Sequence, residues 1–435
     1  MMNYYLSQNQ TAEGILTMGG IPLTQLARQF GTPLYLMDEA HIRHQCQWFK
    51  THFKHPEVET EVIYASKAFL PIAMAQLVAS EGLSLDVVSG GELYTAVQAN
   101  YPMENIYLHG NNKSLEELQF ALDAKVGTLV LDNSYELDRL IRLLKPHHHM
   151  KILLRVNPGI EAHTHEYIAT TKNNSKFGLS VFDASTMDVI KRIHEQPQLT
   201  FLGLHSHIGS QIFEAASFDQ HAKAIMDYVS KIKETLHVTV KAINLGGGFG
   251  VRYTAQDTPL KGSNYLNTML ESIVAAAKDH ALEIPKVMIE PGRAIVANAG
   301  VTLYEVGNAK TTFAQKRYCF VDGSMADHIR TALYQAQYHG VLANRVNDPH
   351  EHPYTVTGKA CESGDIIIKE VDLPHPNPGD LLAVFSTGAY HYSMASNYNR
   401  LTRPPVVFVR EGEAKVVVRK ETYQDLIQYD VKDAL

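Results

Sequence analysis

Short apolar runs rich in β-branched residues recur at a regular pitch through the first 300 residues, and more polar, helix-like segments separate them. The runs are nearly continuous rather than alternating, which is typical of parallel strands that are buried on both faces. There are eight of them, at residues 62–66, 84–88, 105–109, 128–132, 151–156, 201–207, 242–247 and 286–291. The pattern therefore predicts alternating strands and helices around one parallel sheet.

The segments between the runs carry the signals that begin and end helices. Ser89 and Ser114 each stand three residues before a glutamate, as in a capping box, and Pro71 suits a first helical position. Residues that suit a helix C-terminus follow, namely Gly82, Asn100 and Gly127. We therefore expect a helix after each of the first strands.

Eight strand–helix units between residues 62 and 291 fit a closed (β/α)8 barrel, whose usual length is about 250 residues. An open, doubly wound sheet is the alternative that the same alternation allows. The number of strands favours the barrel, and we predict an α/β fold with a TIM-like barrel over residues 36–298. After about residue 300, strand-like pieces are separated by Gly, Pro and charged residues. We expect a mostly antiparallel β-domain over residues 299–435, joined by residues 1–35.

Composition and charge mainly exclude classes of protein. The net charge is −7 without a basic block, which argues against a nucleic-acid surface. No apolar run approaches the roughly 18 residues of a membrane helix, and the N-terminus lacks the basic and apolar regions of a signal peptide. Cys46, Cys319 and Cys361 have no metal-ligand spacing and suit a reducing compartment. We expect a cytoplasmic protein without a metal site and without nucleic-acid or membrane partners.

Polar groups and glycines gather at the carboxyl ends of the predicted strands, where barrels of this kind carry their active sites. Lys67 ends the first strand, and a charged amine after an apolar run costs free energy unless something uses it. The second strand ends around Asp86. The last three strands run into HSHIGSQ (205–211), GGGFG (246–250) and EPGR (290–293). Stability alone does not require such ends, so we expect a functional site there.

The glycines at 246–248 let backbone N–H groups approach an anion, although a tight turn explains them equally well when they are taken alone. Barrels often bind phosphate after strands seven and eight, and Arg293 adds a group suited to a bidentate contact. Together with Lys67 as a desolvated nucleophile and the carboxylate of Glu290, this set suggests pyridoxal phosphate. Glu290 would keep the pyridine nitrogen protonated, and His207 would stack on the ring.

Each of these assignments has a plainer alternative. Lys67 could be paired with Asp86, Glu290 could be a core carboxylate paired with an arginine, and His207 could be structural. Each alternative is plausible alone, but all three holding together is much less so. The residues themselves therefore favour decarboxylation of an amino acid by pyridoxal phosphate.

Seven motifs resemble, in their order and spacing, those of the fold-type III pyridoxal-phosphate decarboxylases. They are YASKAF, DVVSGGEL, HSHIGSQ, NLGGGFG, EPGR, CESGD and GAY, and the similarity runs from about residue 20 to about residue 410. The resemblance implies a decarboxylase that uses pyridoxal 5'-phosphate. It further implies meso-2,6-diaminopimelate as the substrate, decarboxylated at its D-centre to L-lysine and CO2 in the last step of lysine biosynthesis.

The resemblance also implies roles for single residues. Catalysis is expected of Lys67 as the Schiff-base lysine, of His207 against the cofactor and of Cys361 as the proton donor. The expected cofactor-binding residues are Lys67, Asp86, His207, Ser210, Gly247, Gly248, Glu290, Gly292, Arg293 and Tyr390. The expected substrate-binding residues are Arg293, Arg330, Tyr334, Glu362 and Tyr390. Of these, Glu362 is expected to bind the distal amino group of the substrate.

In this family the CESGD loop comes from the partner subunit, so the resemblance implies a head-to-tail homodimer with shared active sites. From the residues alone, a lone cysteine such as Cys361 is more often buried and inert. A nearby cation such as Lys67 would instead shift the pKa of its thiol to a useful range. Arg330 could be a surface arginine at a helix start or a clamp for a carboxylate.

Three features depart from the family pattern, one of them being that LTRPPVVFV, at residues 401–409, lacks the acidic residue often found after the prolines. Thr331 stands in place of proline, and Thr171 stands where glycine is common, in a loop over residues 163–178 whose conformation the sequence leaves open. Other functions remain open as well. The chain could be a relative that acts on ornithine, lysine or arginine, or a non-catalytic barrel that serves as a binding module. A barrel racemase is disfavoured, since it would normally place a basic group rather than Glu290 at the pyridine nitrogen.

Overall fold

The computed structural model describes residues 9–160 and 175–432, and these form two compact units. One, called here the barrel unit, comprises Gln45–Gly250 and Thr258–Ala294, as far as they are described. The other, called the β unit, comprises the described parts of Met1–His44, Val251–Asp257 and Ile295–Leu435. The functional domain boundaries near residues 36 and 298 stay predictions. The loop position Thr171 lies outside the described residues.

The barrel unit is built around eight parallel strands that close into a circle. They pair in the order β5–β6–β7–β8–β9–β11–β12–β13, and β13 pairs with β5 to complete the circle. Their bounds are β5 Thr60–Ala65, β6 Ser84–Val87, β7 Ile106–Leu108, β8 Thr128–Leu131, β9 Met150–Asn157, β11 Leu199–His205, β12 Ala242–Asn244 and β13 Lys286–Ile289. The short β10 (Leu179–Ser180) extends the sheet beside β9. Closure excludes the open sheet, so the predicted barrel is confirmed.

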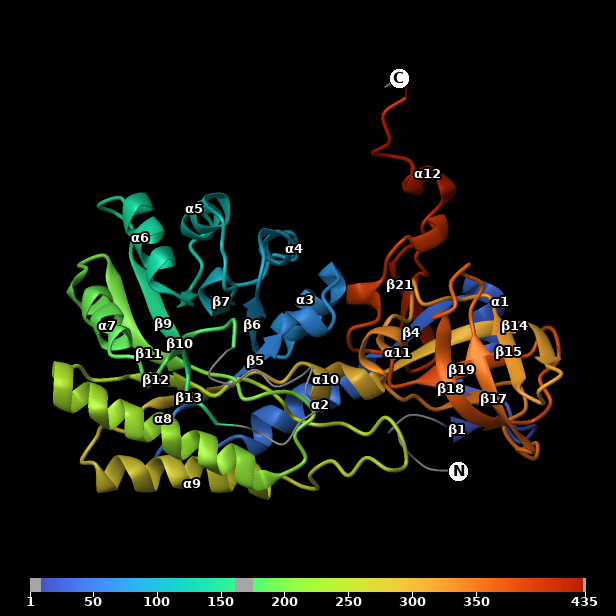
Figure 1. The fold of residues 1–435 in the computed structure, drawn as a ribbon, viewed down its shortest axis with the longest axis horizontal. Coiled ribbons are helices and arrows are strands. Elements are labelled where there is room, and N and C mark those ends of the chain that lie inside the picture. The colour runs from blue at the N-terminus through green and yellow to red at the C-terminus, as the bar shows by residue number, and fades with distance from the viewer. Residues whose placement is uncertain (1–8, 161–174, 433–435) are drawn as a thin grey trace. The chain divides into compact units, whose positions relative to one another are not determined.

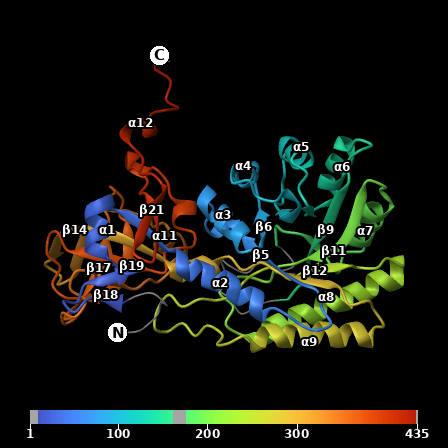
Figure 2. The ribbon, with the colours of Figure 1, turned by 180° about the vertical axis from the view of Figure 1, so that it is seen from behind.

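Helices alternate with the barrel strands in sequence, beginning with α2 before β5 (Figure 1). Their bounds are α2 Glu39–His52, α3 Ile72–Ser80, α4 Gly90–Gln98, α5 Leu115–Asp123, α6 Ser134–Leu143, α7 Ser185–Glu195, α8 Ala215–Leu236 and α9 Asn264–Asp279. The long helices α8 and α9 lie side by side in both views (Figures 1 and 2). The alternation predicted from the apolar runs is therefore present throughout the barrel.

The helices begin close to the predicted residues, but the capping contacts differ from the prediction at Ser89 and Pro71. Ser114 forms a full capping box at the start of α5. The Ser89 side chain accepts the N–H of Glu92 at 3.2 Å, but the Glu92 carboxylate accepts from Val88 rather than from Ser89, so this capping box is incomplete. Pro71 is the residue before α3 rather than its first residue. Side-chain capping thus begins these helices close to where the sequence placed them.

One predicted helix end is wrong in its residue. Gly82 and Asn100 have the expected left-handed backbone, with φ of 67° and 55°. After α5, however, the left-handed residue is Lys125, with φ of 57°, and not Gly127. Gly127 is needed for a different reason, because a Cβ there would lie 1.9 Å from the carbonyl oxygen of Glu104. A close approach of two backbone segments, and not a helix end, therefore explains this glycine.

The β unit contains a three-stranded sheet and a larger sheet that is mostly antiparallel, with β15–β17 and β4–β20 as its parallel pairs. The predicted β-domain architecture is thus confirmed. The strands are β1 Asn9–Gln10, β2 Leu16–Met18, β3 Ile21–Pro22, β4 Leu34–Asp38, β14 Gly300–Thr311, β15 Arg317–Val321, β16 Gly340–Leu342, β17 His352–Thr357, β18 Ile366–Leu373, β19 Leu381–Phe385, β20 Val406–Arg410 and β21 Glu413–Val418. The remaining helices are α1 Leu23–Phe30, α10 Arg293–Val296, α11 Arg330–Tyr334 and α12 Tyr423–Leu426.

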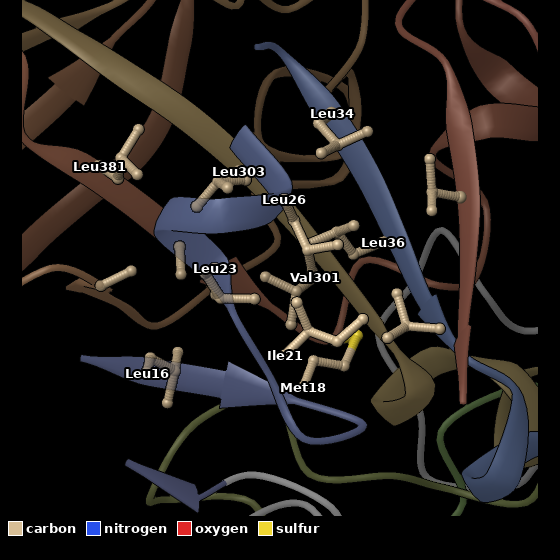
Figure 3. Packing of buried hydrophobic residues seen from close by; sticks show 14 of the residues in the cluster. Leu16, Met18, Ile21, Leu23, Leu26, Leu34, Leu36, Val301, Leu303 and Leu381 are labelled. Carbon is tan, nitrogen blue, oxygen red and sulfur yellow. The ribbon is translucent and has the colours of Figure 1, made fainter. Parts of the chain in front are cut away.

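Helix α1 packs its apolar side chains against strands β4 and β14 (Figure 3). Leu26, Leu36 and Leu303 are fully buried in this cluster. Burial of one such leucine contributes about 1.5–3 kcal/mol, so this packing holds the N-terminal segment to the β unit. Among the residues described, none of the helices combines the length and the apolar character that crossing a membrane requires.

Candidate active site

Glycines let the loops at the carboxyl end of the barrel strands approach one another closely. The N–H of Ile212, after β11, donates to the carbonyl oxygen of Gly248, after β12, at 2.9 Å. A Cβ on Gly248 would lie 2.7 Å from the carbonyl oxygen of Gly209, and one on Gly247 would lie 2.3 Å from that of Glu290. A larger residue would push these segments apart. The loops after β11, β12 and β13 therefore form one continuous rim.

The Glu290 carboxylate lies buried just after β13 and is held by groups from three other strand ends. Asn244 Nδ2 donates to Oε1 at 2.7 Å, and the Nε2 atoms of His109 and His205 lie 3.0 Å and 3.2 Å from Oε1 and Oε2. Burial raises the pKa of this carboxyl, but the two histidines outweigh burial and hold it well below its usual range. Glu290 is therefore a fixed anion. Among the described residues no arginine forms an ion pair with it, so the arginine alternative is wrong.

Asp86, on β6, is a second buried carboxyl group at this end of the barrel. Burial raises the pKa of Asp86 to about 7, with His109 and Lys67 opposing the rise and Glu290 adding to it. Its Oδ1 has no hydrogen-bond partner among the described residues. Asp86 is thus protonated far more readily than the neighbouring Glu290, and its unpaired oxygen suits a hydrogen-bond donor on a ligand.

Lys67 follows β5 in a short 3-10 helix over Ser66–Ala68. Its side chain is exposed, and among the described residues none forms a hydrogen bond or ion pair with its amine. The expectation of a desolvated amine is therefore corrected for the protein alone, and the alternative in which Lys67 is paired with Asp86 is wrong. Its charge nevertheless opposes the rise that burial causes in the pKa of Asp86. An accessible amine at a strand end can condense with an aldehyde.

His207, in the loop after β11, has a fixed ring. The N–H of Gly247 donates to its Nδ1 at 3.2 Å, so the neutral ring carries its proton on Nε2. Burial, followed by the charges of Lys67 and Arg155, lowers the pKa of His207 well below its ordinary value. A neutral imidazole in one orientation is suited to packing against a planar ligand.

Arg293 begins helix α10 and is buried. Its Nη2 donates to the Ser210 hydroxyl oxygen at 3.0 Å. Gly292 brings this turn against the end of β5, because a Cβ on Gly292 would lie 2.9 Å from the Cβ of Ala65. A guanidinium and a hydroxyl group are thereby held side by side, as a phosphate group requires.

These barrel residues fit pyridoxal phosphate. The anion of Glu290 suits a protonated pyridine nitrogen, and the amine of Lys67 suits the aldehyde. Arg293 and Ser210 suit the phosphate, beside glycines whose missing Cβ atoms leave room for close approach. His109 and His205 also place ligand atoms within 4.8 Å of the Glu290 carboxylate, at metal-ligand spacing, so the expectation of no metal stays a prediction.

In the β unit, Arg330 begins helix α11 and is only 8% exposed. Its Nε–H donates to the Tyr338 hydroxyl oxygen at 3.0 Å, and its guanidinium carbon lies 4.9 Å and 5.0 Å from the ring centres of Tyr334 and Tyr390. The alternative of a surface arginine is therefore wrong. No carboxylate among the described residues forms an ion pair with Arg330. A buried guanidinium without such a partner is costly and suits an anionic ligand.

Cys361 lies in an exposed turn of the β unit, whereas the other two cysteines are buried. Its N–H donates to Asn399 Oδ1 at 2.7 Å. The buried carboxylate of Asp365 fixes the turn by accepting two backbone N–H groups, at 2.5 Å and 2.7 Å. The side chain of Glu362 is also exposed. The alternative of a buried, inert thiol is therefore wrong for Cys361.

Comparison with known proteins gives the family. Residues 39–297 match the family model described as "Pyridoxal-dependent decarboxylase, pyridoxal binding domain". Over 98% of its length the chain is 47% identical to a Bacillus subtilis protein named diaminopimelate decarboxylase, of which 97% is covered. The chain belongs to the diaminopimelate decarboxylase family. The resemblance seen in the seven motifs is thereby confirmed, and so is pyridoxal phosphate as the cofactor.

Two solved structures of diaminopimelate decarboxylases are similar to nearly the whole chain. The enzyme from M. jannaschii in complex with L-lysine has a TM-score of 0.91 and 32% identity, with 99% of both chains covered. The enzyme from Helicobacter pylori complexed with L-lysine has a TM-score of 0.85 and 27% identity, with 93% of this chain and 98% of that chain covered. These likenesses agree with a barrel followed by a β-domain.

The structure brings many of the predicted residues together within each unit. At one end of the barrel it gathers Lys67, Asp86, His207, Ser210, Gly247, Gly248, Glu290, Gly292 and Arg293. In the β unit, Arg330 gathers Tyr334 and Tyr390, while Cys361 and Glu362 occupy the separate turn described above.

Three residues that hold Glu290 were missed or given no role by sequence reasoning. His109 was recognised only as the last residue of the predicted strand at 105–109, and His205 and Asn244 only as the first residues of the motifs HSHIGSQ and NLGGGFG. The available signal was position, since all three lie at or just after the last residue of a barrel strand. The candidate site thus includes a supporting set of polar groups around the Glu290 carboxylate.

Proposed function

We propose that this chain catalyses the pyridoxal-phosphate-dependent decarboxylation of meso-2,6-diaminopimelate to L-lysine and CO2, the last step of lysine biosynthesis. The observation that carries the chemistry is the buried anion of Glu290 at the barrel end that also bears Lys67. A carboxylate suits a protonated pyridine nitrogen, whereas a racemase of this fold would normally place a basic group there. The choice of substrate is supported by the name of the Bacillus subtilis relative.

Pyridoxal phosphate, when bound, supplies an electron sink for the pair left by the departing CO2. In this proposal the accessible amine of Lys67 would hold the cofactor through its aldehyde group. Glu290 would keep the proton on the pyridine nitrogen, and the ring of His207, fixed by Gly247, would pack on the cofactor. The other cofactor contacts are assigned to Asp86, Ser210, Gly247, Gly248, Gly292, Arg293 and Tyr390.

The substrate carries two carboxylates and two amines, so charge-matched groups are needed to bind it without leaving a buried charge unpaired. Arg330 is a buried cation without a carboxylate partner among the described residues, and we assign it to a substrate carboxylate. The exposed Glu362 is assigned to the distal amino group. Further substrate contacts are assigned to Arg293, Tyr334 and Tyr390.

The proposal includes a homodimer with shared active sites in the cytoplasm, without nucleic-acid or membrane partners. Cys361 would return a proton to the α-carbon after CO2 has left, which requires an acid held near that carbon. Both Cys361 and Glu362 are exposed on their own chain, as a turn that completes the site of a second chain has to be.

The substrate can be tested by measuring CO2 release from a panel of amino acids with the cofactor-loaded protein. We expect kcat/KM for meso-2,6-diaminopimelate to exceed that for L-lysine, L-ornithine and L-arginine by at least about 100-fold, because these lack the second carboxylate. A preference for one of the other three would identify a related decarboxylase instead. No CO2 release from any of them, with the cofactor shown to be bound, would favour a non-catalytic binding module.

A further inference from the structure

Tyr338 has no role in the function proposed above, yet among the described residues its hydroxyl oxygen is the one hydrogen-bond acceptor of the buried guanidinium of Arg330. The Nε–H of Arg330 donates to the Tyr338 hydroxyl oxygen at 3.0 Å. Both side chains are buried, with 8% and 4% of their surface exposed. A hydrogen bond in such surroundings fixes the plane of the guanidinium group as well as its position.

The ring of Tyr338 is itself packed against other aromatic rings of the β unit. It contacts His328 with 4.6 Å between ring centres, His391 with 5.2 Å and Tyr253 with 5.3 Å, in each case edge to face. Edge-to-face contacts on several sides leave a ring little freedom to turn. The hydroxyl oxygen of Tyr338 is therefore a fixed acceptor rather than a mobile one.

His328, one of the rings around Tyr338, adds no positive charge near the guanidinium. Burial, followed by the charge of Arg330, lowers the pKa of His328 to about 3, so its ring is neutral at physiological pH. Neither ring nitrogen of His328 has a hydrogen-bond partner among the described residues. Arg330 is thus held by a neutral hydroxyl and by the faces of Tyr334 and Tyr390, and its positive charge stays available to an anion.

We propose that Tyr338 is a positioning residue that turns the two Nη groups of Arg330 toward a substrate carboxylate. Because the Nε–H of Arg330 donates to Tyr338, a bidentate contact with a carboxylate has to use the two Nη groups of the guanidinium. This inference rests on the proposed function, in which Arg330 binds substrate. The carboxylate concerned is the one that the reaction does not remove, and L-lysine, the product, retains it.

A pair of ligands isolates this contact. L-lysine carries the retained carboxylate, whereas cadaverine is the same diamine without any carboxylate. If Tyr338 acts only through Arg330, removal of its hydroxyl group weakens the binding of L-lysine but not the binding of cadaverine. If its role were merely structural, loss of the hydroxyl group would lower the affinity for both ligands to the same extent.

The test is Tyr338→Phe in the cofactor-loaded protein, since phenylalanine keeps the ring contacts and removes the hydroxyl. We expect the KM for meso-2,6-diaminopimelate and the inhibition constant of L-lysine to rise about tenfold, with kcat changed less than about twofold. The inhibition constant of cadaverine, the absorbance of the bound cofactor and the unfolding temperature should stay at wild-type values. The exposed Tyr423→Phe serves as the matched control and should change none of these quantities.

A double-mutant cycle gives a second measurement. Arg330→Lys removes the Nε–H but keeps a positive charge, so Tyr338→Phe should have no further effect on L-lysine binding in that background. The inference would be overturned if Tyr338→Phe weakened the binding of L-lysine and of cadaverine equally, or if it left the KM for the substrate unchanged. Additive effects of the two substitutions on L-lysine binding would overturn it as well. A wild-type protein that does not decarboxylate meso-2,6-diaminopimelate would overturn the proposed function itself, and the role of Tyr338 would fall with it.

Discussion

The side-chain amide of Asn244 donates a hydrogen bond of 2.7 Å to Oε1 of Glu290, and both residues are buried at the ends of adjacent barrel strands. With His109 and His205 it forms a set from β7, β11 and β12 around one carboxylate. Burial of an ionised carboxylate is costly unless such partners are present. The fold therefore stabilises a negative charge at the place where the proposed chemistry needs one.

Removal of this charge tests its role. Glu290→Gln keeps the shape of the side chain but cannot hold a proton on the pyridine nitrogen by charge. We expect kcat for meso-2,6-diaminopimelate to fall by about 10²–10³, with cofactor still bound, as measured by single-turnover CO2 release and by cofactor absorbance. Glu57→Gln, at an exposed ion pair with Lys278, is the control and should keep wild-type activity. Full activity of Glu290→Gln would contradict the assignment.

Asp86 predicts a pH dependence of stability in the cofactor-free protein. Burial raises its pKa from 3.8 to about 7, so the folded state binds a proton more tightly than the unfolded state does. The resulting stabilisation is complete below pH 3.8 and is lost as the pH rises through about 7. Asp86→Asn, which cannot ionise, should therefore be more stable than wild type at pH 8, and the difference should shrink toward pH 5.

Urea unfolding at several pH values measures this difference. Asp279→Asn, at an exposed position, is the control and should follow the wild type at every pH. A stability difference between Asp86→Asn and wild type that is constant from pH 5 to pH 8 would show that Asp86 does not titrate in this range.

The exposed thiol of Cys361 predicts a loss of turnover without a loss of stability. Cys361→Ala should bind cofactor and unfold at the wild-type temperature but lose most of its activity, because the acid that returns the proton is gone. Cys319→Ala is the matched comparison at a buried site, and it should lower stability by about 1 kcal/mol while keeping the turnover of the folded protein. If Cys361→Ala loses activity only through unfolding, its role is structural.

Shared sites predict complementation between two inactive variants. Lys67→Ala lacks the cofactor-binding amine and Cys361→Ala lacks the proton donor, so a mixed dimer would hold one intact site. Random exchange of subunits should restore about one quarter of wild-type activity, since half of the dimers are mixed and each has one intact site of two. Absence of rescue, when subunit exchange has been demonstrated with tagged chains, would indicate that each chain builds its own complete site.

The barrel could be predicted from sequence because each strand is a short apolar run between polar segments. The run at 62–66 became β5, Thr60–Ala65, and the run at 242–247 became β12, Ala242–Asn244, followed by its glycine loop. Local patterns were less reliable where distant segments meet. At Gly127 the deciding contact is with Glu104, which no local propensity reveals.

The candidate site was predictable to the extent that it follows from strand ends. The positions of Lys67 and Glu290 at the carboxyl end of the barrel follow from that rule. The contact of Asn244 with Glu290 does not, because it depends on the register between β12 and β13, in which Asn244 lies opposite Met288. The exposure of Lys67 was also missed, since burial depends on what covers a strand end rather than on the strand itself.

The most direct test of the account is borohydride reduction of the cofactor-saturated protein, followed by peptide mapping of the trapped group. The structure distinguishes two lysines near the strand ends. Lys67 is exposed, whereas Lys113 is buried and donates to the Glu136 carboxylate and to two carbonyl oxygens. The account predicts that the cofactor is recovered on Lys67 and that Lys67→Ala abolishes the label. Recovery on another lysine, or no label in cofactor-saturated protein, would contradict it.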